Sequence, residues 1–120
     1  VIADGFYEWK KVGSKKEPYR FVIQKSEPYA FAGLWDETEN PKGGKQLSFA
    51  IITTVPNKVT EKIHNRMPVI LDKSEEQEWL QDGNIKLLDS YPESKMSVYK
   101  VSSLLNSAKT DTKTLILPIK

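Results

Sequence analysis

The glutamate in the stretch GFYEWKK, residues 5–11, is the first side chain in this sequence that could do chemistry. If the stretch is a β-strand, Phe6 and Glu8 lie on one face, because successive strand side chains alternate. A carboxylate on an apolar face loses hydration unless a donor or a cation meets it. Glu8 therefore has either a raised pKa suited to general acid work or the role of a strand-end glutamate paired with Lys or Arg.

The residues HNR, at 64–66, form the second candidate. His64 is the single histidine of the chain, and histidine is the side chain whose proton moves near neutral pH. It comes where a predicted helix ends, so it could equally cap that helix or compensate its dipole. Arg66 could bind a phosphate or a carboxylate with two hydrogen bonds, or form a surface ion pair. Sequence separation alone does not show whether Glu8 and His64 meet.

Aromatic residues of the predicted strands are further candidates. Trp9, Trp35 and Tyr19 could stack on nucleobases, although strand aromatics belong more often to the core. The glycine pair at Gly43 and Gly44 lacks the spacing of a phosphate-binding loop. The chain has no cysteine and one histidine, so we expect no disulfide, no metal site and no cofactor.

Composition limits the class of protein. With 120 residues the chain is long enough for a single domain, residues 1–120, and too short for two of ordinary size. Apolar residues make up 38% and charged residues 28%, as in soluble globular proteins, and no apolar run is long enough to span a membrane. A net charge of +2 does not by itself indicate nucleic-acid binding. The absence of cysteine agrees with a reducing, cytoplasmic setting.

The chain opens directly into a strand-like pattern without an initiator methionine. We therefore expect it to be a fragment of a longer protein that exposes apolar surface along its first strand. A dimer or swapped homo-oligomer would cover such a surface. A monodisperse monomer that unfolds cooperatively would argue against this expectation.

Hydrophobic periodicity divides the chain into five or six strands and two or three short helices. The expected strands are 1–11, 19–24, 28–37, 47–54, 96–103 and 114–120. The expected connections are a hairpin over 11–18, a turn over 25–28 and a loop over 39–46. No internal repeat or low-complexity segment is present.

Three features of the central part of the chain give specific expectations. Gly33 suggests a bulge or a close approach of two backbones. The nearly continuous apolar run over 47–54 predicts a central, buried strand. Val59 and Ile63, spaced i, i+4, predict a short helix over 57–63.

The sequence that follows is typical of a capped helix. Ser74 and Gln77 form a capping box, so 73–83 predicts a helix that ends at Gly83. Residues 85–91 predict a further helical or irregular packed segment. Many short strands with few helices indicate an α+β fold whose mixed sheet is curled and partly barrel-like.

Four motifs follow one another along the chain: ADGFYEW at 3–9, FAGLWD at 31–36, ITTVPN at 52–57 and IHNRMPVIL at 63–71. Together they resemble the SRAP family, the SOS-response-associated peptidases, also called abasic-site processing proteins. The resemblance runs from the first residue to about Trp79 and is weaker in the final strands. Because HNRMP and GFYEW are both present at a compatible separation, the match is specific.

The resemblance implies a chemistry. SRAP proteins carry a cysteine directly after the initiator methionine, which attacks the ring-opened aldehyde of an abasic site in single-stranded DNA and forms a thiazolidine. An asparagine and an arginine near the N-terminus, a motif glutamate and a motif histidine assist. Only the last two have counterparts here, Glu8 and His64. Because the chain has no cysteine, we expect the C-terminal portion of a longer SRAP domain, itself inactive in covalent capture.

The resemblance also implies roles for individual residues. Glu8 would position the terminal amine and exchange protons during Schiff-base formation and reversal. His64 would donate a proton to the sugar ring oxygen as the ring opens to the aldehyde. The residues expected to line a DNA-binding surface are Arg66, Trp9, Thr53, Thr54 and Asn57.

The leading expectation is thus an enzyme of the DNA-damage response that captures abasic sites in single-stranded DNA and processes its own N-terminus. One alternative is a true peptidase that uses Glu8 and His64 on other peptides. Another is a non-catalytic module whose aromatics stack on single-stranded DNA. The expected partner is DNA and not a membrane, in a bacterial or phage-host cytoplasm, in association with the nucleoid.

Overall fold

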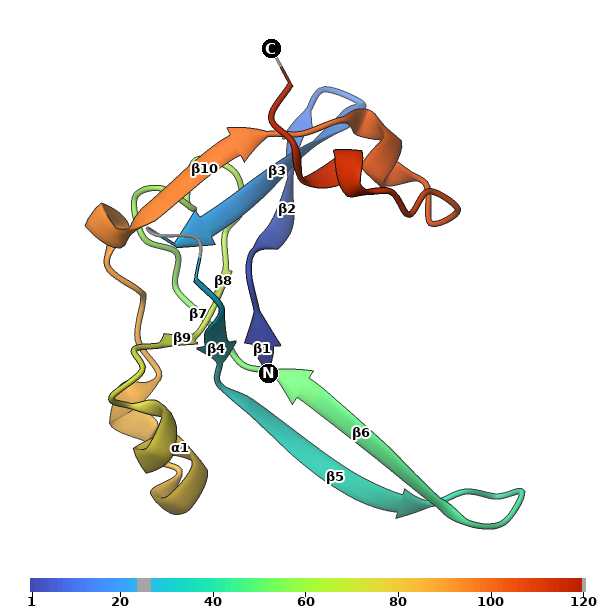
Figure 1. Ribbon diagram of the computed structural model, residues 1–120, viewed down its shortest axis with the longest axis vertical. Helices are drawn as coiled ribbons and strands as arrows, with labels where there is room; N and C mark the ends of the chain where they lie inside the picture. Colours follow the sequence, from blue (N-terminus) through green and yellow to red (C-terminus); the bar gives the residue numbers. More distant parts are fainter. Residues whose placement is uncertain (24–26, 120) are drawn as a thin grey trace.

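The computed structural model describes residues 1–23 and 27–119 of the chain. Over these residues the chain is mostly β-strand, with one α-helix and four short 3₁₀ helices (Figure 1). The strands are β1 (Ile2–Ala3), β2 (Phe6–Val12), β3 (Lys15–Ile23), β4 (Tyr29–Phe31), β5 (Gly33–Glu39), β6 (Lys45–Ile51), β7 (Thr53–Thr54), β8 (Met67–Pro68), β9 (Ile70–Leu71) and β10 (Met96–Lys100). The helices are α1 (Glu76–Asp82), η1 (Ile85–Leu87), η2 (Glu93–Lys95), η3 (Ser103–Asn106) and η4 (Lys113–Ile116). The expected α+β class is confirmed.

The described strands pair antiparallel in four small sheets, with the orders β1-β4-β9, β10-β3-β2, β5-β6 and β7-β8. All these pairs are antiparallel and none of the four sheets closes on itself, so the structure does not support the expected mixed, partly barrel-like sheet. The reason is strand length. The strands β1, β7, β8 and β9 have two residues each, too few to carry a continuous ladder around a barrel.

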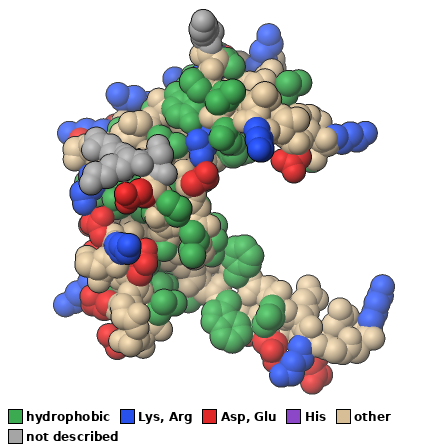
Figure 2. All heavy atoms as spheres, viewed as in Figure 1, with side chains coloured by type: hydrophobic (Ala, Val, Ile, Leu, Met, Phe, Trp, Pro, Cys, Tyr) green, Lys and Arg blue, Asp and Glu red, His purple; other side chains and the backbone are tan. Residues whose placement is uncertain are grey.

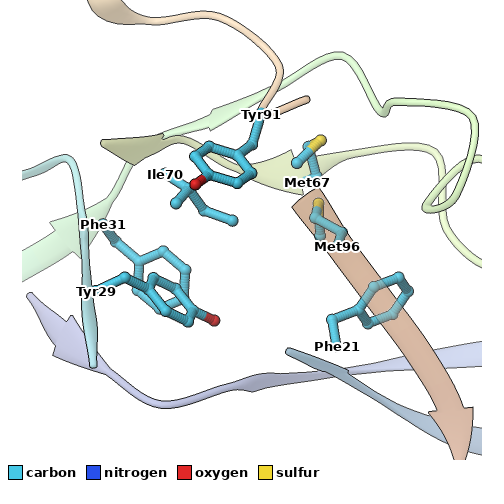
Figure 3. Close-up of a cluster of buried hydrophobic side chains, with 7 residues drawn as sticks. All are labelled: Phe21, Tyr29, Phe31, Met67, Ile70, Tyr91 and Met96. Atoms are coloured by element: carbon cyan, nitrogen blue, oxygen red, sulfur yellow. The ribbon is translucent and has the colours of Figure 1, made fainter. Parts of the chain in front are cut away.

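The main core lies against one face of the β10-β3-β2 sheet. Phe6 and Phe21 are partners in the β2–β3 register, and their rings stack with centroids 4.8 Å apart. Figure 3 shows the buried cluster: Phe21, Tyr29, Phe31, Met67, Ile70, Tyr91 and Met96. Because strand side chains alternate, the face of β2 that carries Phe6 also carries Glu8.

The β5–β6 hairpin projects away from the rest of the molecule (Figure 1). The prediction of a central buried strand over 47–54 is wrong, because every residue of β6 is exposed. An apolar, β-branched run fits a strand well, but the run does not say which neighbour covers it. The expected loop over 39–46 is confirmed as the hairpin connection, with Gly43 and Gly44 at positive φ.

Residues 58–63 form consecutive turns, so the predicted helix over 57–63 is wrong. Two hydrogen bonds of helical spacing are present, from the N–H of Glu61 to the carbonyl of Asn57 and from His64 to Thr60, each 2.9 Å long. These two bonds are not consecutive, and the N–H of Ile63 bonds the carbonyl of Thr60 three residues back, so no continuous helical ladder forms.

The helix α1 ends where the sequence predicts and begins differently. Gly83 terminates it in the left-handed conformation with φ 57°, and its N–H donates to the carbonyl of Trp79 at 3.1 Å. The capping box predicted from Ser74 is wrong, because Glu75 occupies the N-cap position. The Glu75 carboxylate instead accepts a hydrogen bond from the N–H of Asp72 at 2.8 Å, which fixes the turn before the helix.

The two ends of the chain also depart from the predicted strands. Residues 1–11 form two strands, separated at Asp4 and Gly5. For the described residues 114–119 the predicted extended run is wrong, because η4 occupies its first part and an isolated bridge between Val101 and Pro118 follows. The predicted turn over 25–28 lies partly outside the described residues.

Candidate active site

Glu8 lies on the core side of β2, where the apolar face ends. Tyr19 is its partner in the β3 register, and Phe6, the preceding residue on its face, packs against the core. The Glu8 side chain is 22% exposed. Burial raises the pKa of Glu8 above its usual value, while the charge of His64 and a hydrogen bond with the Trp9 backbone lower it in part. Glu8 thus holds its proton to a higher pH than an exposed carboxylate.

The turn that ends at His64 places the imidazole next to Glu8. Ile63 packs against the core, and the N–H of His64 donates to the carbonyl of Thr60 at 2.9 Å. His64 Nδ1 lies 3.7 Å from Glu8 Oε1, although the two residues are far apart in the sequence. The same nitrogen lies 3.1 Å from the carbonyl oxygen and 3.3 Å from the nitrogen of Arg66. The structure therefore brings the two titratable candidates together.

The geometry of this pair suits proton transfer. A separation of 3.7 Å is within ion-pair distance and longer than a direct hydrogen bond. One bridging water, or a movement of about 1 Å, would connect the groups, and such contacts commonly tighten when substrate binds. Because Nδ1 of His64 faces Glu8 and the Arg66 backbone, Nε2 is the nitrogen that can meet a substrate.

Arg66 is exposed beside His64, and Thr53 on β7 holds its guanidinium. Arg66 Nε donates to Thr53 Oγ1 at 3.1 Å, and Nη2 donates to the same hydroxyl at 3.0 Å and to the Thr53 carbonyl. These bonds leave Nη1 for an anion. Sequence reasoning missed the role of the Thr53 hydroxyl, because only the pairing of β7 with β8 brings these two residues together. Thr54, the neighbour of Thr53, is half-buried.

Asn57 has a structural role. Its side chain is buried, and Oδ1 accepts hydrogen bonds from the N–H groups of Val59 at 3.2 Å and Thr60 at 3.0 Å. Its Nδ2 donates to the carbonyl of Tyr91 at 2.7 Å. Both ends of the amide are therefore used inside the protein, and Asn57 shapes the turn that positions His64.

The structure does not bring Trp9 to the Glu8–His64 pair. Trp9 follows Glu8 along β2, so its side chain lies on the other face of the sheet. Its indole N–H donates to Asn106 Oδ1 at 2.7 Å, and Asn106 Nδ2 donates to the carbonyl of Lys16 at 3.1 Å. Trp9 thereby attaches η3 to the β2–β3 hairpin. Of the other aromatic candidates, Tyr19 packs against the core, and Trp35 is exposed on the projecting hairpin.

A buried arginine on this second face fixes the start of β2. Arg20 donates to the hydroxyl of Tyr99 at 2.9 Å and to the carbonyl of Asp4 at 3.3 Å, and it forms an ion pair with the Asp4 carboxylate at 3.2 Å. A Cβ on Gly5 would lie 2.8 Å from Arg20 Nε, so a larger residue here would have to displace the Arg20 guanidinium from these contacts. The Asp-Gly pair of the first motif thus sets the path of the strand that presents Glu8.

The raised pKa of Glu8 predicts a pH-dependent stability. Folded Glu8 keeps its proton at pH values where the unfolded chain, with a pKa of about 4.3, has lost it. The free energy of unfolding therefore falls as the pH rises from the unfolded pKa to the folded one, and this loss remains at higher pH. We expect Glu8→Gln to be more stable than the native chain at pH 8 and equally stable at pH 3, as measured by urea denaturation.

The matched control is Glu61→Gln, at an exposed position in the neighbouring turn. It should change stability by the same small amount at both pH values. A Glu8→Gln chain that is less stable at pH 8 than the native chain would show that the Glu8 charge stabilises the fold, against the burial argument.

No group of three or more His, Cys, Asp or Glu side chains in the described residues is arranged to hold a metal ion. Among the described helices, none is both long and apolar enough to cross a membrane.

Fold and site together define a class of protein: an open, strand-rich α+β chain with a carboxylate–imidazole pair beside an arginine suited to an anion. Residues 1–108 match the family described as SOS response associated peptidase (SRAP). The chain belongs to this SRAP family, as the four sequence motifs predict.

Named relatives support this assignment. The chain is 44% identical over 123 residues to abasic site processing protein YoqW of Bacillus subtilis (strain 168), a match that covers 97% of the chain and 55% of YoqW. It is 31% identical over 144 residues to abasic site processing protein HMCES of Gallus gallus, covering 100% of the chain and 43% of HMCES. A crystal structure of a Bacteroides thetaiotaomicron protein superposes with a TM-score of 0.88 at 29% identity, covering 100% of the chain and 56% of that protein. The chain thus spans about half the length of the curated relatives it matches.

Proposed function

We propose that this chain is part of an enzyme that captures abasic sites in single-stranded DNA covalently. The nucleophile would be an N-terminal cysteine, which the sequence of this chain does not contain. The names of YoqW and HMCES, both abasic site processing proteins, support the substrate class. Such a substrate would place the protein with the DNA of a bacterial or phage-infected cytoplasm.

The observation that carries the proposal is the approach of His64 to Glu8, with Nδ1 and Oε1 3.7 Å apart. Ring opening of the deoxyribose needs a proton on the ring oxygen, and imine formation needs protons moved from the amine to the departing water. His64 would deliver the first through Nε2. Glu8, with its raised pKa, would exchange the second. Addition of the thiol to the imine carbon then closes the thiazolidine without a further leaving group.

Covalent trapping tests the proposal. We define the Met-Cys form as a longer form of the protein in which an N-terminal part beginning Met-Cys precedes Val1. This form should shift a labelled abasic oligonucleotide to a heat-stable band on a denaturing gel. The Met-Ser form, in which serine replaces that cysteine, and the 120-residue chain alone should not, because thiazolidine formation needs an amine and a thiol on one terminal residue. An adduct that survives the cysteine replacement would refute the mechanism.

Arg66, whose guanidinium is hydrogen-bonded to Thr53, is the proposed contact to the DNA backbone. We expect Arg66→Ala in the Met-Cys form to weaken binding of single-stranded oligonucleotides by a similar factor for every sequence. The dependence of the binding constant on salt concentration should become shallower by about the amount that one phosphate contact contributes. Fluorescence anisotropy at several salt concentrations measures both. Lys62→Ala, an exposed cation in the preceding turn, is the control. Loss confined to one base sequence would contradict a phosphate role.

The same pair of residues also supports the alternative of peptide hydrolysis, since Glu8 and His64 could activate a water. The family description contains the word peptidase. Release of peptides from an unrelated protein substrate by the Met-Ser form, lost on Glu8→Gln, would favour this alternative. A non-catalytic DNA-binding module is less well supported, because Trp9 lies on the face of β2 opposite Glu8 and is bonded to Asn106.

A further inference from the structure

The last part of the described chain contacts the face of the β10-β3-β2 sheet that is opposite the Glu8–His64 pair. We call residues 103–119, which contain η3 and η4, the C-terminal strap. The strap lies beside the sheet at the end of the molecule away from the β5–β6 hairpin (Figure 1). Open space separates this end of the molecule from the hairpin (Figure 2). The contacts of the strap with the sheet are therefore its connection to Glu8.

The first anchor of the strap is at the residue that follows Glu8. Asn106 in η3 accepts a hydrogen bond from the indole N–H of Trp9 at 2.7 Å and donates to the carbonyl of Lys16 at 3.1 Å. One amide thus holds a side chain of β2 and the backbone of β3 together. Because Trp9 and Glu8 are consecutive in a strand, a hold on the Trp9 side chain limits the movement of the backbone that carries Glu8.

The second anchor acts on the chain before Glu8. The hydroxyl of Tyr99, on β10, donates to the carbonyl of Ile116 in η4 at 2.9 Å and accepts from Arg20 Nη1 at 2.9 Å. Arg20 also donates to the carbonyl of Asp4 at 3.3 Å and pairs with its carboxylate at 3.2 Å. A continuous series of polar contacts thus runs from the strap to the break between β1 and β2.

The strand register places the two anchors on either side of Glu8. Arg20 is the cross-strand partner of both Tyr7 and Tyr99, so these side chains form one row on the strap side of the sheet. Trp9 belongs to the next row on that side. Since Tyr7 and Trp9 are the two neighbours of Glu8, Glu8 projects from the other face between two rows that are bonded to the strap.

Buried contacts fix the strap to the sheet. Arg20 is 8% exposed, and Leu115 in η4 is 6% exposed. Val101 is fully buried, donates to the carbonyl of Pro18 at 3.1 Å and forms an isolated bridge with Pro118. Water has little access to replace bonds at such positions when a partner is removed. The strap is therefore held by buried contacts as well as by the exposed bond at η3.

We propose that the C-terminal strap positions Glu8, with Asn106 and Tyr99 as positioning residues that touch neither the substrate nor the reacting atoms. The two anchors fix the path of β2 on both sides of Glu8 and so set the approach of Glu8 Oε1 to His64 Nδ1, which is 3.7 Å. A misplacement of about 1 Å in a catalytic group can cost a factor of about 100 in rate. The expected effect on rate rests on the proposed function, whereas the effect on the geometry of the pair does not.

Asn106→Ala combined with Tyr99→Phe in the Met-Cys form tests the proposal. Single-turnover gels at saturating abasic oligonucleotide should show a limiting rate about 10- to 100-fold below the native rate. The oligonucleotide concentration that gives half of this rate should not change. Carbon-13 NMR of the Glu8 carboxyl group should show its pKa shifted toward that of an exposed glutamate, because a less fixed strand leaves Glu8 more hydrated. The Glu8 signal is assigned by its absence from Glu8→Gln.

Two single variants are the controls. Asn106→Asp keeps an acceptor for the Trp9 indole and should retain most of the native rate, unlike Asn106→Ala. Ser107→Ala removes a hydroxyl that is bonded within the strap, where it accepts from the N–H of Lys109 at 3.4 Å, and should change neither the rate nor the pKa of Glu8. If the double variant does not fold by circular dichroism, the contrast between Asn106→Ala and Asn106→Asp, at an exposed bond, decides in the same way.

A folded double variant with the native limiting rate and the native Glu8 pKa would overturn the inference. So would a double variant that loses only affinity for the oligonucleotide, since the strap would then be a binding surface. A shifted Glu8 pKa at the native rate would leave the positioning role standing and refute the role of Glu8 in the proposed function.

Discussion

Replacing His64 by Ala in the Met-Cys form should lower the rate of adduct formation with an abasic oligonucleotide by about 100- to 10,000-fold, the usual effect of a lost general acid. The reason is geometric. His64 Nδ1 faces Glu8 Oε1 at 3.7 Å and the Arg66 backbone, so Nε2 is available to protonate the sugar ring oxygen. Glu8→Gln should slow the reaction within the same range, because an amide cannot exchange the proton. Single-turnover gels with labelled oligonucleotide measure both rates.

The controls for this prediction separate chemistry from folding. Glu61→Gln removes an exposed carboxylate from the neighbouring turn and should leave the rate unchanged. Binding of an oligonucleotide without an abasic site should be the same for native, His64→Ala and Glu8→Gln proteins. If the two variants form adducts at the native rate, or lose all oligonucleotide binding, the assignment of acid–base roles is wrong.

Local sequence signals predicted local geometry well. Gly83 ends α1 because a left-handed residue costs glycine little, and Gly33 permits an approach in which a Cβ would lie 3.0 Å from the Ala50 carbonyl oxygen. The alternation of β2 placed Phe6 and Glu8 on one face, as the strand period requires. These features depend on neighbours within a few residues, which is the information that a single sequence carries.

Predictions that needed a neighbour from elsewhere in the chain failed. The apolar run of β6 forms a strand, but its burial depends on what packs against the hairpin, and the described chain places nothing there. The i, i+4 spacing of Val59 and Ile63 did identify the side of the turn that packs on the core. It could not distinguish a helix from consecutive turns, since both put these residues on one side.

In the candidate site, too, local features could be predicted from the sequence and long-range contacts could not. Periodicity identified Glu8 as a carboxylate in need of a partner, and the family resemblance supplied His64, but their approach is a tertiary fact. Contacts that hold the site together left no signal in the sequence. The Thr53 hydroxyl meets Arg66 only through the pairing of β7 with β8. The close approach of the Arg20 side chain to Gly5 likewise exists only in the folded protein.

Replacing Asn57 by Ala should destabilise the fold by about 2–4 kcal/mol, because buried backbone groups lose their hydrogen-bond partners. Asn57 Oδ1 accepts from Val59 and Thr60, and Nδ2 donates to the Tyr91 carbonyl at 2.7 Å. Alanine leaves two N–H groups and one carbonyl without these partners, and water has little access because the side chain is buried. Urea denaturation of the 120-residue chain measures the loss.

Asn84→Ala is the matched control, because Asn84, a half-buried residue, also caps a turn and accepts a solvent-exposed hydrogen bond from the N–H of Lys86 at 3.0 Å. Water replaces that bond, so the cost there should stay near 1 kcal/mol or below. Since the Asn57 turn also carries His64, Asn57→Ala in the Met-Cys form should slow adduct formation even where the protein is still folded. Equal destabilisation by the two alanine variants would show that burial does not make the Asn57 hydrogen bonds more stabilising than exposed ones. A native rate of adduct formation by Asn57→Ala would show that these bonds do not position His64.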